Sequence, residues 1–228
     1  KRLSFVLHQM RVCAQAHELK PSFCYYKRWG VRKKNGTGHK PVIPLQFSKS
    51  GSPEIERSYA THFVDLARVH SDSVVCDPFC GSGTILIEAA FKALRIAPGM
   101  HRRFLAEKWA QIPESVWKEA RSEAVARIQR DATFTAIGSD IDEAAIALTE
   151  ENCRRAGVKP RIRLVQQDVA EFQPPEGAIT ICNPPYGERM LDIQQAQSIY
   201  RIMGDVFPAD KAHPCYIITP DADFELHF

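Results

Sequence analysis

The tetrapeptide Asn183-Pro184-Pro185-Tyr186 follows a short apolar run and carries groups suited to holding a planar base with an exocyclic amine. The Asn183 amide oxygen and the Pro184 backbone carbonyl are two acceptors for such an NH2 group. Pro185 rigidifies the loop, so both acceptors keep one direction, and Tyr186 offers a flat face for stacking. The loop therefore predicts catalysis by orientation of an amino nucleophile, without a strong base.

A glycine-rich turn, residues 77–84 (Asp-Pro-Phe-Cys-Gly-Ser-Gly-Thr), lies between a short apolar run and a helix-like segment. Glycine at 81 and 83 lets the backbone bend sharply and lets a bulky ligand approach. The turn has neither the G-x-G-x-x-G pattern of dinucleotide folds nor the Gly-Lys-Thr of a phosphate loop. Asp77 would repel phosphate and attract the ammonium and sulfonium groups of S-adenosylmethionine. We therefore predict contacts to this methyl donor from Asp77, Pro78, Phe79, Gly81 and Gly83.

A second acid follows the predicted strand 134–139. Asp140 is placed to accept hydrogen bonds from a ribose diol, as an acid does at this point in dinucleotide folds, and Ile141 is predicted to contact the cofactor beside it. The alternative role is a helix N-cap, which we assign instead to Asp142, ahead of a helix that begins near Glu143.

A third acid, Asp168, follows the predicted strand 162–165. It is placed to accept from the adenine amino group, with Val169 packing on the ring. The alternative for Asp168 is a plain turn aspartate. Asn183 is also counted among the predicted cofactor contacts, because it follows the next strand of the series.

Predicted strands and helices alternate along residues 53–228. The strands are 73–77, 134–139, 162–165, 178–182 and 216–219, and the helices are 53–69, 84–94, 143–155 and 193–207. This alternation predicts an α/β fold with a parallel, doubly wound, Rossmann-like sheet. Ligands of such sheets bind at the carboxyl ends of the strands, where each polar candidate above lies.

The chain divides into a basic arm, residues 1–52, and a catalytic domain, 53–228, with an insertion at 97–131 that predicts one or two helices. Residues 1–40 contain ten Lys or Arg and one acid, a net charge of +9; since the whole chain carries +3, the remaining 188 residues carry −6. A basic arm on an acidic body indicates a polyanion partner. Four aromatic residues within 21–30 of the arm alternate with its cations, which suits stacking on unpaired bases; the alternative is a solvated arm whose aromatics pack on the main domain. They are Phe23, Tyr25, Tyr26 and Trp29.

The seven cysteines are scattered, without a Cys-x-x-Cys pair, and predict small buried residues in a reducing compartment, not a metal site or a disulfide framework. No apolar run approaches the length of a membrane span, and no leader pattern is present, so a cytoplasmic protein without a membrane partner is expected. Because the first residue is Lys1, the natural sequence is expected to be longer.

Five motifs together resemble the bacterial ribosomal RNA guanine-N2 methyltransferases, over about residues 53–228. They are the 77–84 turn, Ile96-Ala97-Pro98-Gly99, Trp109, 138–142 (Gly-Ser-Asp-Ile-Asp) and 183–189 (Asn-Pro-Pro-Tyr-Gly-Glu-Arg). The resemblance implies a class I methyltransferase fold, S-adenosylmethionine as donor, and the N2 amine of a guanosine in large-subunit ribosomal RNA as acceptor. By position, it implies cofactor binding by Asp77, Phe79, Gly81, Gly83, Asp140 and Asp168, and guanine binding by Asn183, Pro184 and Tyr186.

Three features depart from that family pattern. One is the stretch that in relatives leads into the catalytic domain, which does not match well here. Relatives usually carry an RNA-binding THUMP domain ahead of the catalytic domain, and residues 1–52 are too short to contain one. The family fold also continues past its fifth strand into an antiparallel hairpin, whereas this chain stops at Phe228. The RNA-binding role of the arm therefore rests on its charge and aromatics alone.

Other acceptors and one other class of protein fit the same residues. Adenine-N6 methylation of DNA or RNA and guanine-N2 methylation of transfer RNA use the same loop type, and the insertion and the arm favour structured RNA. A duplex base would have to leave its stack to reach the loop. A non-catalytic RNA-binding subunit with a relic cofactor fold is the non-enzyme alternative. It is disfavoured because such a relic has no reason to retain Asp77, Gly81, Gly83, Asn183 and Tyr186.

Overall fold

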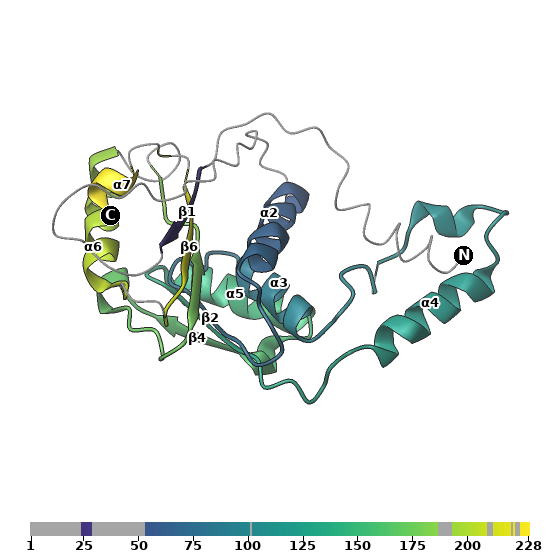
Figure 1. Cartoon of the computed structure of the whole chain (residues 1–228). Coiled ribbons are helices and arrows are strands. Elements are labelled where there is room, and N and C mark those ends of the chain that lie inside the picture. The colour runs from purple at the N-terminus through teal and green to yellow at the C-terminus, as the bar shows by residue number, and fades with distance from the viewer. Residues whose placement is uncertain are drawn as a thin grey trace.

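The computed structural model describes residues 24–28, 53–100, 102–186, 193–208, 212–219, 221 and 224–228 (Figure 1). Within these ranges, six strands form one sheet in the order β1-β6-β5-β2-β3-β4. Their bounds are β1 Cys24–Arg28, β2 Val74–Asp77, β3 Thr135–Asp140, β4 Ile162–Gln166, β5 Ile179–Cys182 and β6 Cys215–Thr219. Strands β2 to β6 are parallel where they pair, which confirms the predicted doubly wound α/β fold.

Helices cover both faces of the sheet (Figure 1). The described helices are α2 Pro53–Leu66, α3 Thr84–Ala93, α4 Glu114–Ala126, α5 Glu143–Arg155, α6 Ile193–Val206 and α7 Phe224–His227, with 3-10 turns η1 Leu105–Lys108, η2 Lys159–Arg161 and η3 Val169–Glu171. One apolar cluster contains Phe63 of α2, Leu86 of α3 and Cys153 of α5. A second contains Met203 of α6 and Phe224 of α7.

The strands contribute to both clusters because successive side chains of a strand point to opposite faces. In β2, Val75 belongs to the first cluster and Cys76 to the second. In β6, Tyr216 belongs to the first and Ile217 to the second. The strands are therefore buried on both faces, as expected for a parallel sheet covered by helices.

The order of the strands reverses between β2 and β5. From β2 the chain moves outward through β3 and β4, and then returns to the other side of β2 to add β5 and β6. The carboxyl ends of β2 and β5 therefore border the crevice in which doubly wound folds bind ligands.

The edge strand β1 comes from the predicted basic arm. It pairs antiparallel with β6, with Cys24 opposite Thr219 and Arg28 opposite Cys215. An antiparallel strand thus lies beside β6 at this edge of the sheet. The rest of the arm and its aromatic side chains lie outside the described residues.

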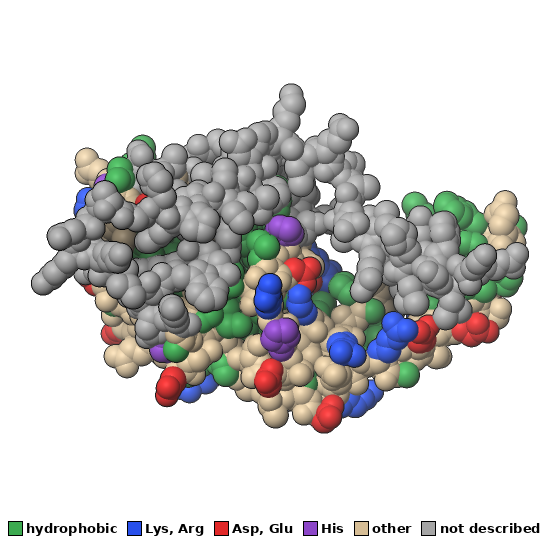
Figure 2. Space-filling model, viewed as in Figure 1, with side chains coloured by type: hydrophobic (Ala, Val, Ile, Leu, Met, Phe, Trp, Pro, Cys, Tyr) green, Lys and Arg blue, Asp and Glu red, His purple; other side chains and the backbone are tan. Residues whose placement is uncertain are grey.

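The insertion stands apart from the sheet (Figures 1 and 2). It contains η1 and α4, in agreement with the prediction of one or two helices. Its side chains form a third, smaller apolar cluster around Trp117 and Ala120.

The described cysteines with resolved side-chain burial are free and buried, as predicted: Cys76, Cys80, Cys153, Cys182 and Cys215. Removal from water is the main cause that raises the pKa of Cys76 and of Cys80 to about 12, so both thiols beside the glycine turn are protonated at neutral pH. Within the described ranges, no cluster of His, Cys, Asp and Glu could hold a metal ion. Among the helices described, none has the length and apolar character needed to cross a bilayer.

Candidate active site

The predicted site residues lie at the carboxyl ends of neighbouring parallel strands. Asp77 ends β2, Asp140 ends β3, Asp168 lies two residues beyond β4, and Asn183 directly follows β5. Parallel strands place their carboxyl ends on the same side, so these four residues lie along one side of the sheet, with Asn183 and Asp77 bordering the crevice between β5 and β2, and Asp140 and Asp168 following at the next two strands. The fold therefore brings residues as far apart in sequence as Asp77 and Asn183, 106 positions, to the same side of the sheet.

The glycine turn depends on left-handed backbone conformations. Gly81 has φ 51° and Gly83 has φ 79°, a region that residues with a Cβ rarely adopt. Gly83 also closes the turn by donating its N–H to the carbonyl of Cys80 at 2.7 Å, and it caps the N-terminus of α3. A Cβ at Gly83 would lie 2.7 Å from Cγ2 of Thr149, so both the conformation and the space require glycine.

Helix α5 holds the outer side of this turn through two side chains. The Thr149 hydroxyl donates to the carbonyl of Gly81 at 2.7 Å, and the Asn152 amide donates to the carbonyl of Ser82 at 2.9 Å. Neither Thr149 nor Asn152 was among the site residues predicted from the sequence. The available signal was their spacing of three, which places two polar side chains on one face of a helix, and Thr149 is fully buried on that face.

Asp140 joins the ends of β2 and β3. Its Oδ2 accepts from the N–H of Gly81 at 3.0 Å, and its Oδ1 accepts from the N–H of Asp142 at 3.1 Å. A carboxylate has about four lone-pair sites, so two further donors, such as those of a diol, can still bind. Ile141 beside it is 67% exposed and offers an apolar surface at this edge.

The N-cap role falls to Asp142, as predicted, because its Oδ1 accepts from the N–H of Ala144 at 2.9 Å. Asp168 is exposed and acts as a turn aspartate, the alternative role considered for it. Its Oδ1 accepts from the N–H of Ala170 at 2.8 Å and caps η3. Val169 is 8% exposed and packs into the second apolar cluster, so only a small part of its side chain remains for a ligand.

Asp77 is almost fully buried, with 1% of its surface exposed. Burial raises the pKa of Asp77 to about 8; the N–H of Phe79, which donates to Oδ1 at 3.1 Å, opposes the rise, and the charge of Asp140 adds to it. At neutral pH the carboxyl is therefore mostly protonated. A cation placed next to it would favour the ionised form and lower this pKa.

The Asn-Pro-Pro-Tyr loop presents Asn183 to solvent, whereas Pro184 is buried. The hydroxyl of Tyr200 on α6 lies 3.5 Å from the carbonyl of Pro185 and 3.5 Å from the hydroxyl of Thr219 at the end of β6. Tyr200 is itself fully buried, so it connects the loop to both α6 and β6. Sequence reasoning missed this residue, because no local pattern distinguishes it from an ordinary core tyrosine.

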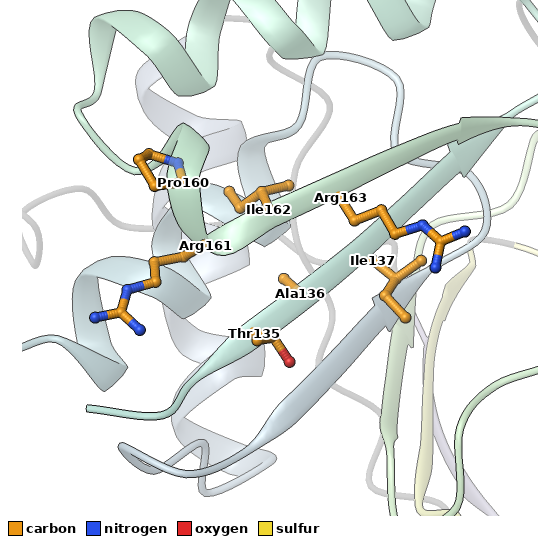
Figure 3. A pocket seen from close by; sticks show the side chains of 7 residues that line it. All are labelled: Thr135, Ala136, Ile137, Pro160, Arg161, Ile162 and Arg163. Atoms are coloured by element: carbon orange, nitrogen blue, oxygen red, sulfur yellow. The ribbon is translucent and has the colours of Figure 1, made fainter. Parts of the chain in front are cut away.

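A hollow of about 320 Å³ lies at the amino ends of β3 and β4, opposite the predicted site. In Figure 3 the guanidinium groups of Arg161 and Arg163 point to opposite sides. Arg161 is engaged with the backbone carbonyls of Ala132 and Arg130, at 2.6 and 2.8 Å. The hollow therefore lacks converging polar groups. Its lining residues are Thr135, Ala136, Ile137, Pro160, Arg161, Ile162 and Arg163.

Comparison with known proteins finds one family of methyltransferases. The model of the RMKL-like methyltransferase domain (UPF0020) matches residues 49–227. The Bacillus subtilis (strain 168) protein YpsC is 35% identical over 193 residues, which are 84% of this chain and 49% of YpsC. The ribosomal RNA large subunit methyltransferase K/L of Shewanella baltica (strain OS195) is 43% identical over 142 residues, 60% of this chain and 20% of that protein.

Solved structures agree with these matches. The crystal structure of SMU.472 complexed with SAH superimposes with a TM-score of 0.73 at 34% identity, over 76% of this chain and 46% of SMU.472. A predicted N6-adenine-specific DNA methylase from Listeria monocytogenes superimposes with a TM-score of 0.72 at 39% identity, over 78% of this chain and 47% of that one. The chain spans about half the length, or less, of the relatives that it matches.

Proposed function

The chain belongs to the RMKL-like methyltransferase family, and from this premise we propose that it transfers a methyl group from S-adenosylmethionine to the exocyclic N2 amine of a guanosine in RNA. Large-subunit ribosomal RNA is the proposed substrate, in the cytoplasm. The observation that carries the proposal is the meeting of the glycine turn, Asp140 and the Asn-Pro-Pro-Tyr loop at the carboxyl ends of adjacent strands.

The residues present fit the cofactor. The backbone at Gly81 is open to a bulky ligand, since no atom lies nearer than 4.0 Å to the position of a Cβ there. The Asp140 carboxylate keeps capacity for a diol, and the exposed Ile141 suits an apolar ring face. Asp168 is exposed just beyond the end of β4, the strand next to β3. The SAH complex of the similar SMU.472 structure supports this assignment. When bound, S-adenosylmethionine supplies a methyl carbon activated by the sulfonium.

The Asn-Pro-Pro-Tyr loop orients the amine. The Asn183 side-chain oxygen and the Pro184 carbonyl each accept one N–H of the NH2 group, which fixes the direction of the nitrogen lone pair. Tyr186 stacks on the base, and the buried Tyr200 keeps the loop in place from behind. The rate gain then comes from orientation, and the nitrogen loses its proton easily once the methyl bond forms.

The name of the S. baltica relative supports ribosomal RNA as the substrate. One observation favours a second candidate, adenine-N6 methylation of DNA, because the L. monocytogenes protein of similar structure carries that name. An adenine amine and a guanine amine make the same two hydrogen bonds to the loop, so its geometry accommodates both.

Product analysis tests the proposal. Methyl transfer from labelled S-adenosylmethionine is measured on total RNA and, in parallel, on DNA, followed by nucleoside digestion and mass identification. We expect N2-methylguanosine in large-subunit RNA, and methyl transfer slower by about a hundredfold with the Asn183→Ala variant. N6-methyladenine would establish the second candidate instead. Cofactor binding without any methylated product would contradict the proposed activity of this chain.

A further inference from the structure

The insertion has an internal packing that fixes its shape. The rings of Phe104 and Trp117 stack with centroids 5.9 Å apart and planes at 19°. A Cβ at Gly99 would lie 2.7 Å from the Phe104 ring, so the chain approaches this pair as closely as glycine allows. Ala120 is fully buried beside them on α4. The surface carried by η1 is therefore held in one orientation relative to α4.

The one acid of residues 100–109 is neutralised within the insertion. Oε1 of Glu107 accepts from the N–H of Phe104 at 2.8 Å and from the Arg121 guanidinium at 2.5 Å. Both hydrogen bonds lower the pKa of the Glu107 carboxyl, and the one from the N–H of Phe104 has the larger effect. The same guanidinium donates to the carbonyl of Arg102 at 3.1 Å. With Glu107 compensated by Arg121, the exposed cations Arg103 and Lys108 give the outer surface of η1 a positive charge.

Two large apolar side chains at the ends of η1 are left in solvent. Leu105 is 81% exposed and Trp109 is 54% exposed, although Trp117 nearby is buried. Figure 2 shows hydrophobic side chains gathered near the outer end of the insertion. The Trp109 backbone is fixed on both sides, since its N–H donates to Ala106 and its carbonyl accepts from Ile112. An exposed indole on a hydrogen-bonded backbone, next to cations, is an arrangement by which proteins stack unpaired bases between phosphate contacts.

The insertion that carries this surface leaves and rejoins the fold at the end of the sheet opposite the candidate active site. Helix α3 begins at the glycine turn and runs ten residues, about 15 Å, back along the sheet before the insertion starts. The insertion rejoins the sheet at Thr135, the amino end of β3. Arg161 fastens that return by donating to the carbonyls of Arg130 and Ala132. The insertion is thus anchored at the amino ends of the strands, opposite the carboxyl ends that form the candidate active site.

We propose that Trp109, with Arg103 and Lys108, binds an unpaired segment of the RNA substrate remote from the methylated nucleotide. This inference rests on the proposed function for the identity of the RNA. The charge of the surface favours a polyanion over an apolar protein partner or a second copy of the chain. The consequence is a substrate requirement: a large folded RNA reaches both surfaces, whereas a short fragment around the methylated nucleotide reaches only the active site.

Steady-state kinetics with two RNA substrates test this consequence. The substrates are a large-subunit ribosomal RNA transcript and a short fragment of it that contains the methylated nucleotide. For Trp109→Ala we expect the KM for the transcript to rise about tenfold, the loss of one base stack, with kcat, cofactor affinity and the KM for the fragment unchanged. Trp109→Phe should restore the KM. Lys118→Ala, which removes an exposed cation of α4 that pairs with Glu114 at 3.1 Å, is the matched control.

A binding assay without methyl transfer separates this inference from the proposed function. Addition of a uridine dodecamer should quench the fluorescence of Trp109, and the quenching should persist in Trp29→Phe and disappear in Trp109→Phe. The double variant Arg103→Ala, Lys108→Ala should lower the salt slope of binding by about 1.4, or 0.7 for each lost phosphate contact. Quenching without methyl transfer would contradict the proposed function and support the inference.

Three results would overturn the inference while leaving the proposed function intact. The first is an unchanged KM for the transcript in Trp109→Ala. The second is an equal rise for transcript and fragment, which would place the contact at the active site. The third is a dimer that Trp109→Ala dissociates without any effect on RNA binding, because the surface would then hold a second copy of the chain.

Discussion

Replacing Asp77 with Asn separates the charge of this buried residue from its shape. In the wild type, the N–H of Phe79 donates to Oδ1 of Asp77 at 3.1 Å. Asparagine keeps an oxygen for this hydrogen bond and removes the ionisable carboxyl. Burial raises the pKa of Asp77 from the ordinary 3.8 to about 8, with the charge of Asp140 as a lesser cause. The substitution should therefore change stability and cofactor affinity in opposite directions.

The stability effect follows from proton binding. Between about pH 4 and pH 8 the folded protein holds the Asp77 proton, whereas the unfolded chain has released it. The contribution of Asp77 to stability is therefore full below pH 4, falls as the pH rises, and is lost above pH 8. At about 1.4 kcal/mol per pH unit, the loss across the window is on the order of 5 kcal/mol. The Asn variant has no such loss, so at pH 9 it should be more stable than the wild type without cofactor.

Cofactor affinity should respond in the opposite sense. With a pKa of about 8, roughly one tenth of the Asp77 side chains are ionised at pH 7. If the cationic cofactor binds next to the ionised carboxylate, its affinity should rise up to about tenfold per pH unit from pH 6 to pH 8 and then level off. Asp77→Asn should bind the cofactor more weakly above pH 8, without this rise. The ratio of the two affinities at each pH cancels the titration of the cofactor itself.

Two measurements check the reasoning: thermal unfolding without cofactor from pH 5 to pH 9, and calorimetric titration with S-adenosylmethionine at the same pH values. Asp205→Asn, at an exposed aspartate of α6, is the control and should leave both curves unchanged. Parallel pH–stability curves for Asp77→Asn and the wild type would refute the buried, protonated state. An affinity ratio that does not vary with pH would refute the role of the Asp77 charge in cofactor binding.

Four further substitutions test the site. Asn183→Ala should keep cofactor affinity and lower methyl transfer by about a hundredfold, through lost orientation; wild-type turnover would contradict the mechanism. Thr149→Val removes the donor to the Gly81 carbonyl and should weaken cofactor binding about fivefold in titration, for a loss of about 1 kcal/mol. Gly83→Ala should lower the free energy of unfolding by about 3 kcal/mol in denaturant titration, from its φ of 79° and the contact with Thr149. Tyr200→Phe should lower kcat and leave the KM for the cofactor nearly unchanged. An unchanged kcat would exclude Tyr200 as a positioning residue.

The elements with local signals were predictable from the sequence. Helix α5 has the predicted bounds, Glu143–Arg155, because Asp142 caps its first turn and Gly157, at φ 73°, ends it. The carboxyl-end positions of Asp77 and Asn183 followed from the alternation of strands and helices.

The features that depend on long-range contacts were not predictable in this way. Strand β1 pairs with a strand about 190 residues later, and its place beside β6 depends on that partner. Tyr200 acts on a loop 15 residues away through the packing of α6. From the sequence, Asp77 was expected to attract the cofactor as an anion, whereas its burial raises its pKa to about 8 and makes it mostly neutral at pH 7 until a cation lies beside it. Burial is a property of the assembled fold, so the residue type alone did not reveal it.

The glycine turn is held by residues that are synthesised much later. Its contacts to Thr149 and Asn152 link positions 68 and 70 apart, and the N–H of Gly81 reaches Asp140 across 59. Contacts of such high sequence separation carry a loop-closure cost and form late in folding. The glycine turn therefore reaches its final conformation only when β3 and α5 have docked on β2. An isolated peptide that spans the turn would not adopt this conformation. Cofactor binding should accordingly slow hydrogen exchange across β2, β3 and α5 together, as one cooperative unit.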